Sequence, residues 1–291
     1  MVKVIIHVGY PKTATTWFQN NFYPFVENFQ YFNRELFKKH FLFGSENEFN
    51  EYSTKTFINT NHIICEEEII NIKKGLSVDN KAQRLKTNFK NPQIVIFIRN
   101  QFSILESKYS TYIQKGGTFT FEELINHLFI SNKIKQWDYY SQIKIYIEIF
   151  GYNNVNIFLF EEFNHNRISF IERYIDTFNL KINVNRINYS PKNKSTNAVL
   201  LPFMREANKF SKNKIGFSRD TEKLYFHIPL FHIFSRTSFS ILNHIPIKKR
   251  ISSEKKLKKN TYNKVYQYFK DSNKKLITEF NLDIQKHNYP V

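Results

Sequence analysis

The first twenty residues contain the feature that most constrains the fold of this chain. Residues Val4–Val8 form an unbroken apolar run, which is typical of a strand buried on both faces in a parallel sheet. A turn with Gly9 and Pro11 follows and leads through Lys12 and several threonines into a segment with helical character. Backbone N–H groups at a helix start and a lysine beside them favour anions. The sequence therefore predicts an anion-binding loop at the carboxyl end of the first strand.

The spacing of this loop excludes one class of anion-binding protein. Nucleotide triphosphatases need the pattern G-x-x-x-x-G-K-[ST]. Here Lys12 lies three residues after Gly9, and no glycine directly precedes it. An ATPase or a P-loop kinase is therefore disfavoured, and an ordinary strand-turn-helix with an exposed lysine is the alternative without a function.

A second stretch predicts another phosphate contact. Residues Gln93–Ile98 read as a buried strand, Arg99 follows its end, and Ser107 comes eight residues after Arg99 in a helical segment. Ligands of open α/β sheets lie outside the carboxyl ends of the strands. The planar fork of an arginine suits bidentate phosphate binding, and a serine two helical turns further on adds one hydrogen bond.

Together the two stretches resemble the PAPS-dependent sulfotransferases of bacterial type. PAPS is 3′-phosphoadenosine 5′-phosphosulfate, and PAP is the product it leaves. Residues 11–17 resemble the family's loop for the 5′-phosphosulfate, while Arg99 and Ser107 match the spacing of its 3′-phosphate site. Ala14 stands where the family usually has glycine, so we expect a negative φ at this residue. Gln101 and Ser103 replace a usual proline and aspartate, which affects the loop more than the phosphate ligands.

Three weaker matches follow in the family's order, so the resemblance spans nearly the whole chain. They are a later strand at 154–163, an Asn-x-Ser element at 193–195, and a closing helix and tail at 272–290. The resemblance implies that PAPS is bound without a metal ion, with Trp17 at the position that stacks on adenine in some members. The cofactor-binding residues that it implies are Pro11, Lys12, Thr13, Ala14, Thr15, Thr16, Trp17, Arg99, Ser107, Asn193 and Ser195.

Sulfuryl transfer to a hydroxyl needs a positive charge at the oxygen that leaves and a base for the acceptor's proton. The position of Lys12 suits the first role. The family's base is a His or Glu at the end of the strand between the two phosphate motifs. Here that strand, His62–Cys65, is followed by Glu66, Glu67 and Glu68.

Glu67 matches the position of the base best, and Glu66 is the second candidate. Strand alternation would put Glu66 and Glu68 on one face and Glu67 on the other. A solvated acidic turn is the alternative without a function. His7 lies beside the phosphate loop but within a strand, so we interpret it as a core or supporting histidine before a base.

We expect an α/β fold: a central parallel β-sheet flanked by helices in the P-loop NTPase-like, three-layer arrangement of the sulfotransferases. A single domain over residues 1–291 is expected, with a less regular lid or substrate-side segment at about 213–259. The strands are predicted at 3–9, 61–66, 93–98 and 154–160, and the helices at 14–23, 79–90, 102–115, 121–131, 138–150, 164–179, 197–212 and 260–281.

Charge and composition narrow the partners. The chain has 43 basic and 25 acidic residues and a net charge of +18, which attracts polyanions such as PAPS or an acidic glycan. We predict no nucleic-acid partner and no metal site, and the single cysteine, Cys65, excludes an intrachain disulfide. No apolar run is long enough to span a membrane. The closest, 228–247, favours a lid or core segment over a contact with the membrane surface. A cytoplasmic location follows, with peripheral contact at the inner membrane face left open.

The expected function is transfer of a sulfuryl group from PAPS to a hydroxyl or amine. A saccharide of a cell-surface glycan or glycolipid is the first choice of acceptor, and a small alcohol, phenol or lipid is the second. The rival interpretation is a non-catalytic nucleotide-binding or scaffold protein that keeps the fold. Acceptor-binding segments are expected at about 34–60, 110–120 and 213–259.

Overall fold

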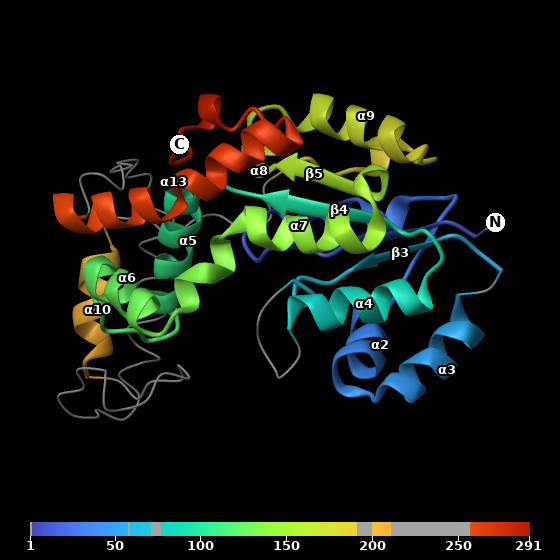
Figure 1. Cartoon of the computed structure of the whole chain (residues 1–291), viewed down its shortest axis with the longest axis horizontal. Coiled ribbons are helices and arrows are strands. Elements are labelled where there is room, and N and C mark those ends of the chain that lie inside the picture. The colour runs from blue at the N-terminus through green and yellow to red at the C-terminus, as the bar shows by residue number, and fades with distance from the viewer. Residues whose placement is uncertain (1, 58, 71–76, 191–199, 211–256) are drawn as a thin grey trace. The chain divides into compact units, whose positions relative to one another are not determined.

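The computed structural model describes residues 2–57, 59–70, 77–190, 200–210 and 257–291 (Figure 1). The predicted lid segment at 213–259 falls outside the described residues except for its last three, and so does the run at 228–247. Asn193 and Ser195 also lie outside them.

The chain divides into two compact units. The first contains Met1–Arg99, Asp138–Lys192 and Ser272–Asn288, and the second contains Asn100–Trp137, Asn193–Asp271 and Tyr289–Val291. The chain passes between the two units several times, and the expectation of a single domain stays a prediction.

The first unit is built on a five-stranded sheet in which every neighbouring pair is parallel. The strand order is β2-β3-β1-β4-β5. The strands are β1 (Val4–His7), β2 (Gln30–Tyr31), β3 (His62–Cys65), β4 (Gln93–Ile98) and β5 (Val155–Leu159). The chain builds the sheet outward on both sides of β1, so the carboxyl end of β1 is the switch point where ligands of such sheets bind.

Helices cover both faces of this sheet, because its central strands are apolar on both sides. All four residues of β1 and of β3 are buried. On one face, α4 (Val78–Asn88) packs against α7 (Tyr139–Phe150), and α7 against β4 and β5 (Figure 1). The other face is covered by α1 (Thr15–Asn21), α8 (Phe160–His165) and α9 (Arg167–Phe178). The predicted three-layer α/β class is thus confirmed.

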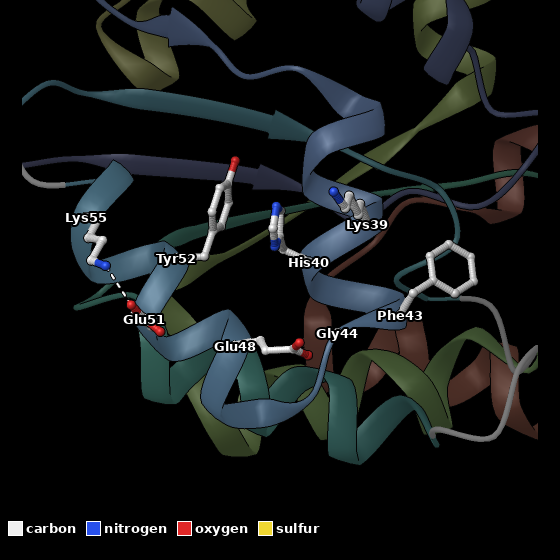
Figure 2. A pocket seen from close by; sticks show the side chains of 8 residues that line it. All are labelled: Lys39, His40, Phe43, Gly44, Glu48, Glu51, Tyr52 and Lys55. Carbon is white, nitrogen blue, oxygen red and sulfur yellow. Dashed lines mark hydrogen bonds and ion pairs between the residues drawn. The ribbon is translucent and has the colours of Figure 1, made fainter.

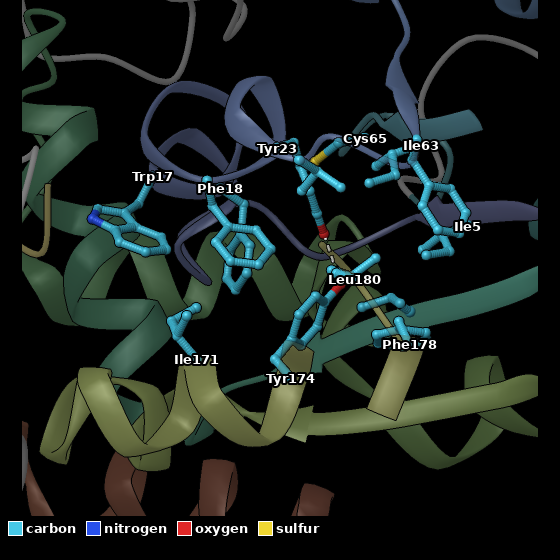
Figure 3. Close-up of a cluster of buried hydrophobic side chains, with 14 of the residues drawn as sticks. Ile5, Trp17, Phe18, Tyr23, Ile63, Cys65, Ile171, Tyr174, Phe178 and Leu180 are labelled. Atoms are coloured by element: carbon cyan, nitrogen blue, oxygen red, sulfur yellow. Dashed lines mark hydrogen bonds between the residues drawn. The ribbon is translucent and has the colours of Figure 1, made fainter. Parts of the chain in front are cut away.

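The core on the α1 side is mainly aromatic. Phe18, Phe97 and Tyr174 meet there with ring centroids 5.1 to 6.4 Å apart. The Tyr23 and Tyr174 hydroxyls share a buried hydrogen bond of 2.8 Å, drawn as a dashed line in Figure 3. This core fixes α1 against the sheet, and with it the loop that joins β1 to α1.

Several elements of the first unit have no counterpart in the sequence-based prediction. They lie between β1 and β3 in the sequence. They are a 3-10 turn at Tyr23–Phe25, α2 (Arg34–Lys38), a π-helical segment η2 (Lys39–Phe43) and α3 (Glu46–Thr56). Three short 3-10 turns, Tyr152–Asn154, Val184–Arg186 and Gln285–His287, complete the unit.

The described part of the second unit consists of helices: α5 (Gln101–Gln114), α6 (Phe121–Ile130), a 3-10 turn at Lys133–Trp137, α10 (Leu201–Asn208) and most of α13 (Lys259–Phe280). The capping box that starts α6 is confirmed, since the Thr120 hydroxyl accepts from Glu123 N and the Glu123 carboxylate accepts from Thr120 N. Among the described helices, none combines the length and the apolar character needed to cross a membrane.

The predicted strands and most predicted helices are confirmed to within a few residues. The exception is the helix expected at 164–179, which the structure divides into α8 and α9. Asn166 leaves the helical region with a φ of −136° and then caps α9, because its side chain accepts from Ser169 N.

Candidate active site

The loop between β1 and α1 has a backbone shaped for an anion. The φ angle is +74° at Lys12 and +68° at Ala14, but it is not positive at Thr13. When right-handed and left-handed backbone conformations alternate, successive N–H groups turn towards one side. The concave site that they form, called a nest, binds anions. The Lys12 side chain is exposed. The loop therefore combines a backbone of the kind found in nests with an exposed lysine, and anion binding by it stays a prediction.

The expected negative φ at Ala14 is wrong. The residue adopts the left-handed conformation with φ +68° and ψ 7°, because the nest requires it at this position. A left-handed alanine costs about 1–2 kcal/mol relative to its preferred conformation, whereas glycine adopts it freely. The chain therefore holds the loop shape that the family's glycine would give, at some cost in stability.

We expect Ala14→Gly to raise the free energy of unfolding by up to about 1 kcal/mol, since the strain relieved exceeds the added entropy of glycine in the unfolded chain. Urea denaturation measures this difference. Ala207→Gly in α10, where the backbone is helical, is the matched control and should lower stability by about 1 kcal/mol. Equal losses in both variants would contradict the strain at Ala14.

The threonines of the loop differ in what their hydroxyls do. Thr13 and Thr15 are buried, and both hydroxyls donate to the carbonyl oxygen of Tyr10, at 2.5 and 3.4 Å. They therefore brace the loop from inside. Thr16 is exposed in the first turn of α1, and Pro11 is half-buried before Lys12. Of the predicted hydroxyl ligands, only Thr16 has an exposed side chain.

Arg99 reaches the phosphate loop from the next strand. It follows β4, and its Nη1 donates to the carbonyl oxygen of Lys12 at 3.0 Å. Its guanidinium lies over the Phe160 ring at 4.4 Å, and the Tyr139 hydroxyl donates to its carbonyl oxygen at 2.6 Å. Arg99 and Lys12 are thus brought together at adjacent strand ends, as the sequence predicted. Ser107 lies half-buried on α5.

Trp17 is held in the core. Its side chain is 4% exposed, its ring packs edge-on against Phe163 at 5.0 Å, and its Nε1 donates to the carbonyl oxygen of Asn188 at 3.0 Å. The Arg167 guanidinium lies over the same ring at 5.7 Å. Figure 3 shows Trp17 at the edge of the buried cluster. The structure therefore gives Trp17 a packing role, and stacking on adenine stays a prediction.

The three glutamates after β3 occupy different environments. Glu66 is fully buried, and both of its carboxylate oxygens accept from the Arg34 guanidinium, at 2.6 and 3.3 Å. The Glu66 carboxylate raises the pKa of Arg34 above its usual value through these hydrogen bonds. Glu66 Oε1 also accepts from Glu68 N at 2.9 Å. This carboxylate therefore holds the start of α2 and the turn after β3.

The strand itself ends at Cys65, and residues 67 and 68 lie in a turn. Glu66 and Glu68 nevertheless both pair with α2, through Arg34 and Lys38 one helical turn apart. Glu68 is half-buried and pairs with Lys38 at 3.5 Å. Glu67 is also half-buried, and within the described ranges its carboxylate makes no hydrogen bond or ion pair.

His7 is a core residue. It is fully buried, its Nδ1 shares a 2.9 Å hydrogen bond with the Tyr23 hydroxyl, and its ring stacks on Phe97 at 5.1 Å. Burial lowers the pKa of His7 to about 3, so it is neutral at pH 7. A methyl group on Gly9 would lie 2.5 Å from His7 Nε2, so only glycine lets the loop pass over this ring.

Arg34 and Gln19 complete the surroundings of the turn, and sequence reasoning missed both. Gln19 in α1 donates from Nε2 to the carbonyl oxygen of Cys65 at 3.1 Å, which ties the helix after the phosphate loop to the end of β3. A lone arginine 32 residues before its acidic partner leaves no pattern in the sequence that could have found it. Across the described part of the chain, no group of three or more His, Cys, Asp or Glu is arranged to hold a metal ion.

Comparisons with solved structures identify the fold. Mouse sulfotransferase SULT7A1, solved in complex with PAP, is 12% identical, and the match covers 98% of this chain and 87% of that chain with a TM-score of 0.52. A sulfotransferase from Alicyclobacillus acidocaldarius is 16% identical over 71% of this chain and 89% of that one, with a TM-score of 0.49. The match to SULT7A1 shows that the chain has the fold of the sulfotransferases. No protein-family model and no curated protein matches it.

Proposed function

We propose that this protein is a PAPS-dependent sulfotransferase that transfers a sulfuryl group to a hydroxyl or amine. The observation that carries the proposal is the β1–α1 loop: alternating φ angles at Lys12 and Ala14, an exposed lysine, and Arg99 bound to the Lys12 carbonyl. A nucleotide with phosphates at both its 5′ and 3′ positions needs positively charged groups at both of these phosphates. The PAP in the SULT7A1 structure, on the same fold, supports this choice of nucleotide.

Each group of the site has a role that follows from its environment. The nest and Lys12 bind the 5′-phosphosulfate, and Lys12 neutralises charge on the oxygen that leaves when the sulfur–oxygen bond breaks. Arg99 binds the 3′-phosphate, and Ser107 stays in the proposal on the resemblance alone. When bound, PAPS supplies the activated sulfuryl group. Asn193 and Ser195 stay in the proposal on the resemblance alone.

The proposed base is Glu67. A base must reach the acceptor's proton with a carboxylate that no cation already holds. Glu66 is buried in its ion pair with Arg34, and Glu68 faces Lys38. The Glu67 carboxylate is the one that the described residues leave without such a partner, and it is half-buried. Glu66 thus becomes a positioning residue, and His7 is too deeply buried to meet an acceptor.

The 3′-phosphate is expected to be required for tight binding, because Arg99 would contact it. Losing a charge-assisted bidentate contact should cost about 2–5 kcal/mol, so PAP should bind at least about 30-fold more tightly than ADP. Calorimetric titration of both nucleotides measures this ratio. Arg99→Gln should remove most of the difference, because it weakens PAP binding more than ADP binding. Equal affinities of the unsubstituted protein for PAP and ADP would contradict the role of Arg99.

A saccharide hydroxyl is the acceptor class that we favour, and a small alcohol, phenol or lipid is the alternative. Mass spectrometry of candidate acceptors incubated with the protein and PAPS tests the transfer directly. A non-catalytic nucleotide-binding protein with this fold would bind PAP and transfer to none of them.

A further inference from the structure

A polar hollow lies beside the phosphate loop in the first unit. Its volume is about 560 Å³. One wall is α1, and the other is formed by the end of β2 and the start of α2. The lining residues are Thr16, Gln19, Asn20, Tyr31, Phe32, Asn33 and Arg34.

Both walls of this hollow continue directly into the proposed reaction centre. Thr16 stands four residues after Lys12, in the first turn of the helix that the phosphate loop begins. At the opposite wall, Arg34 holds Glu66, whose next residue is the proposed base Glu67. Gln19 joins the two sides through the Cys65 carbonyl. A molecule in this hollow is therefore next to both the sulfuryl donor loop and the acidic turn.

The lining side chains offer both hydrogen-bond donors and acceptors. Gln19 uses its NH₂ group for Cys65 O, and Asn20 uses its NH₂ group for Thr16 O at 2.7 Å, so each keeps its carbonyl oxygen. Asn33 uses its carbonyl oxygen to cap α2 at Leu36 N and keeps its NH₂ group. Hydroxyl groups donate and accept at once, so a polyhydroxylated ligand complements this set.

The charge of the hollow selects a neutral ligand. Arg34 is the one charged residue of its lining, and the buried Glu66 carboxylate neutralises it through Nε and Nη2. An anionic group in the hollow would have to be desolvated without a free cation to pair with. The overall positive charge of the chain therefore does not extend to this hollow.

We propose that this hollow is the acceptor subsite and that it takes a neutral sugar residue. Gln19, Asn20 and Asn33 determine specificity by hydrogen bonds to its hydroxyls. This inference rests on the proposed sulfotransferase function. It refines that function, because it predicts that the sugar residue that receives the sulfuryl group is neutral and not acidic.

A second hollow, of about 620 Å³, lies between η2 and α3 (Figure 2). Three of its charged side chains already have partners: Lys55 pairs with Glu51 at 2.5 Å, and Glu48 accepts from Ser45 N at 2.6 Å. His40 stacks on Tyr52 with 3.9 Å between the ring centroids. No residue of α1 or of the turn after β3 lines it. It therefore supplies control positions for the test.

The test uses Asn33→Asp, which keeps the oxygen that caps α2 and replaces the NH₂ group by negative charge. Asn20→Asp is the second variant, and Asn185→Asp, exposed in the 3-10 turn Val184–Arg186, is the control for added charge. The probes are PAPS with the p-nitrophenyl β-glycosides of galactose, glucose and N-acetylglucosamine. The p-nitrophenyl β-glucuronide and p-nitrophenol itself serve as comparison acceptors.

We expect the unsubstituted protein to sulfate a neutral glycoside with a higher kcat/KM than the glucuronide or p-nitrophenol. Asn33→Asp and Asn20→Asp should each lower this kcat/KM about 10-fold, mainly through KM, as for one lost hydrogen bond. Their PAP affinity and Tm, and the activity of Asn185→Asp, should not change.

Two results would overturn the subsite. One is normal kinetics of both hollow variants, and the other is a protein that binds PAP yet prefers the glucuronide or p-nitrophenol, or sulfates none of the glycosides. A protein that does not bind PAP would instead contradict the sulfotransferase function itself, and the subsite with it.

Discussion

Replacing Lys12 by alanine is expected to lower kcat/KM for sulfuryl transfer by about 10³-fold and to leave the fold intact. Removing one group that stabilises charge in a transition state has an effect of this order. The Lys12 side chain is exposed, so it adds no core packing, and alanine adopts the same positive φ that the loop imposes on lysine. Product formation is followed by mass spectrometry, and folding by thermal denaturation.

The control for this variant is Lys39→Ala, which removes an exposed lysine from the second hollow. It should change the transfer rate by less than about twofold. PAP should still bind to Lys12→Ala, more weakly, because the backbone nest and Arg99 remain. A Lys12→Ala protein that melts like the unsubstituted one and keeps near-normal turnover would exclude Lys12 from charge stabilisation.

The parts of the fold that could be predicted are those in which a short run of consecutive residues shows that the segment is buried. Strands β1 and β4 are apolar at consecutive positions because helices cover both faces of the sheet. By contrast, β2 has only two residues, which are too few to show a periodic pattern of apolar and polar residues. The short helix α2 continues directly into a π-helical segment, so residues 34–43 give no regular apolar spacing.

The β1–α1 loop could be located from the sequence because its residues are consecutive. Lys12 and Arg99 were found from their places after two strands, and the parallel pairing of β1 with β4 brings them together. The sign of φ at Ala14 could not be predicted, since alanine normally avoids the left-handed region and only the surrounding loop imposes it.

The acidic turn shows why the rest of the site needed a structure. Three adjacent glutamates look equivalent in a sequence, and alternation seemed to separate them. What distinguishes them is a partner from elsewhere: Arg34, brought to Glu66 by the pairing of β2 with β3. This pairing depends on the edge strand β2, which the sequence does not reveal. The assignment of Glu66 as a positioning residue therefore rests on tertiary contacts alone.

Replacing Glu67 by glutamine is expected to keep PAP binding and to lower the transfer rate by about 10²–10⁴-fold, the usual loss when a general base is removed. Glutamine keeps the size and hydrogen bonding of the side chain but cannot accept the acceptor's proton. The loss should appear in kcat, because Glu67 belongs neither to the nest nor to the polar hollow. Steady-state kinetics with calorimetric titration of PAP separates the two quantities.

The neighbouring glutamates provide controls that differ in what they should change. Glu68→Gln loses a partly exposed ion pair with Lys38 and should keep normal turnover. Glu66→Gln should lower the free energy of unfolding by about 1.5 kcal/mol, since it weakens the charge-assisted hydrogen bonds from Arg34, whose side chain is one-third exposed. Its activity, measured below its melting transition, should stay above that of Glu67→Gln. An inactive but stable Glu66→Gln protein beside a fully active Glu67→Gln protein would move the base to Glu66. Normal turnover of all three variants would place the base outside this turn.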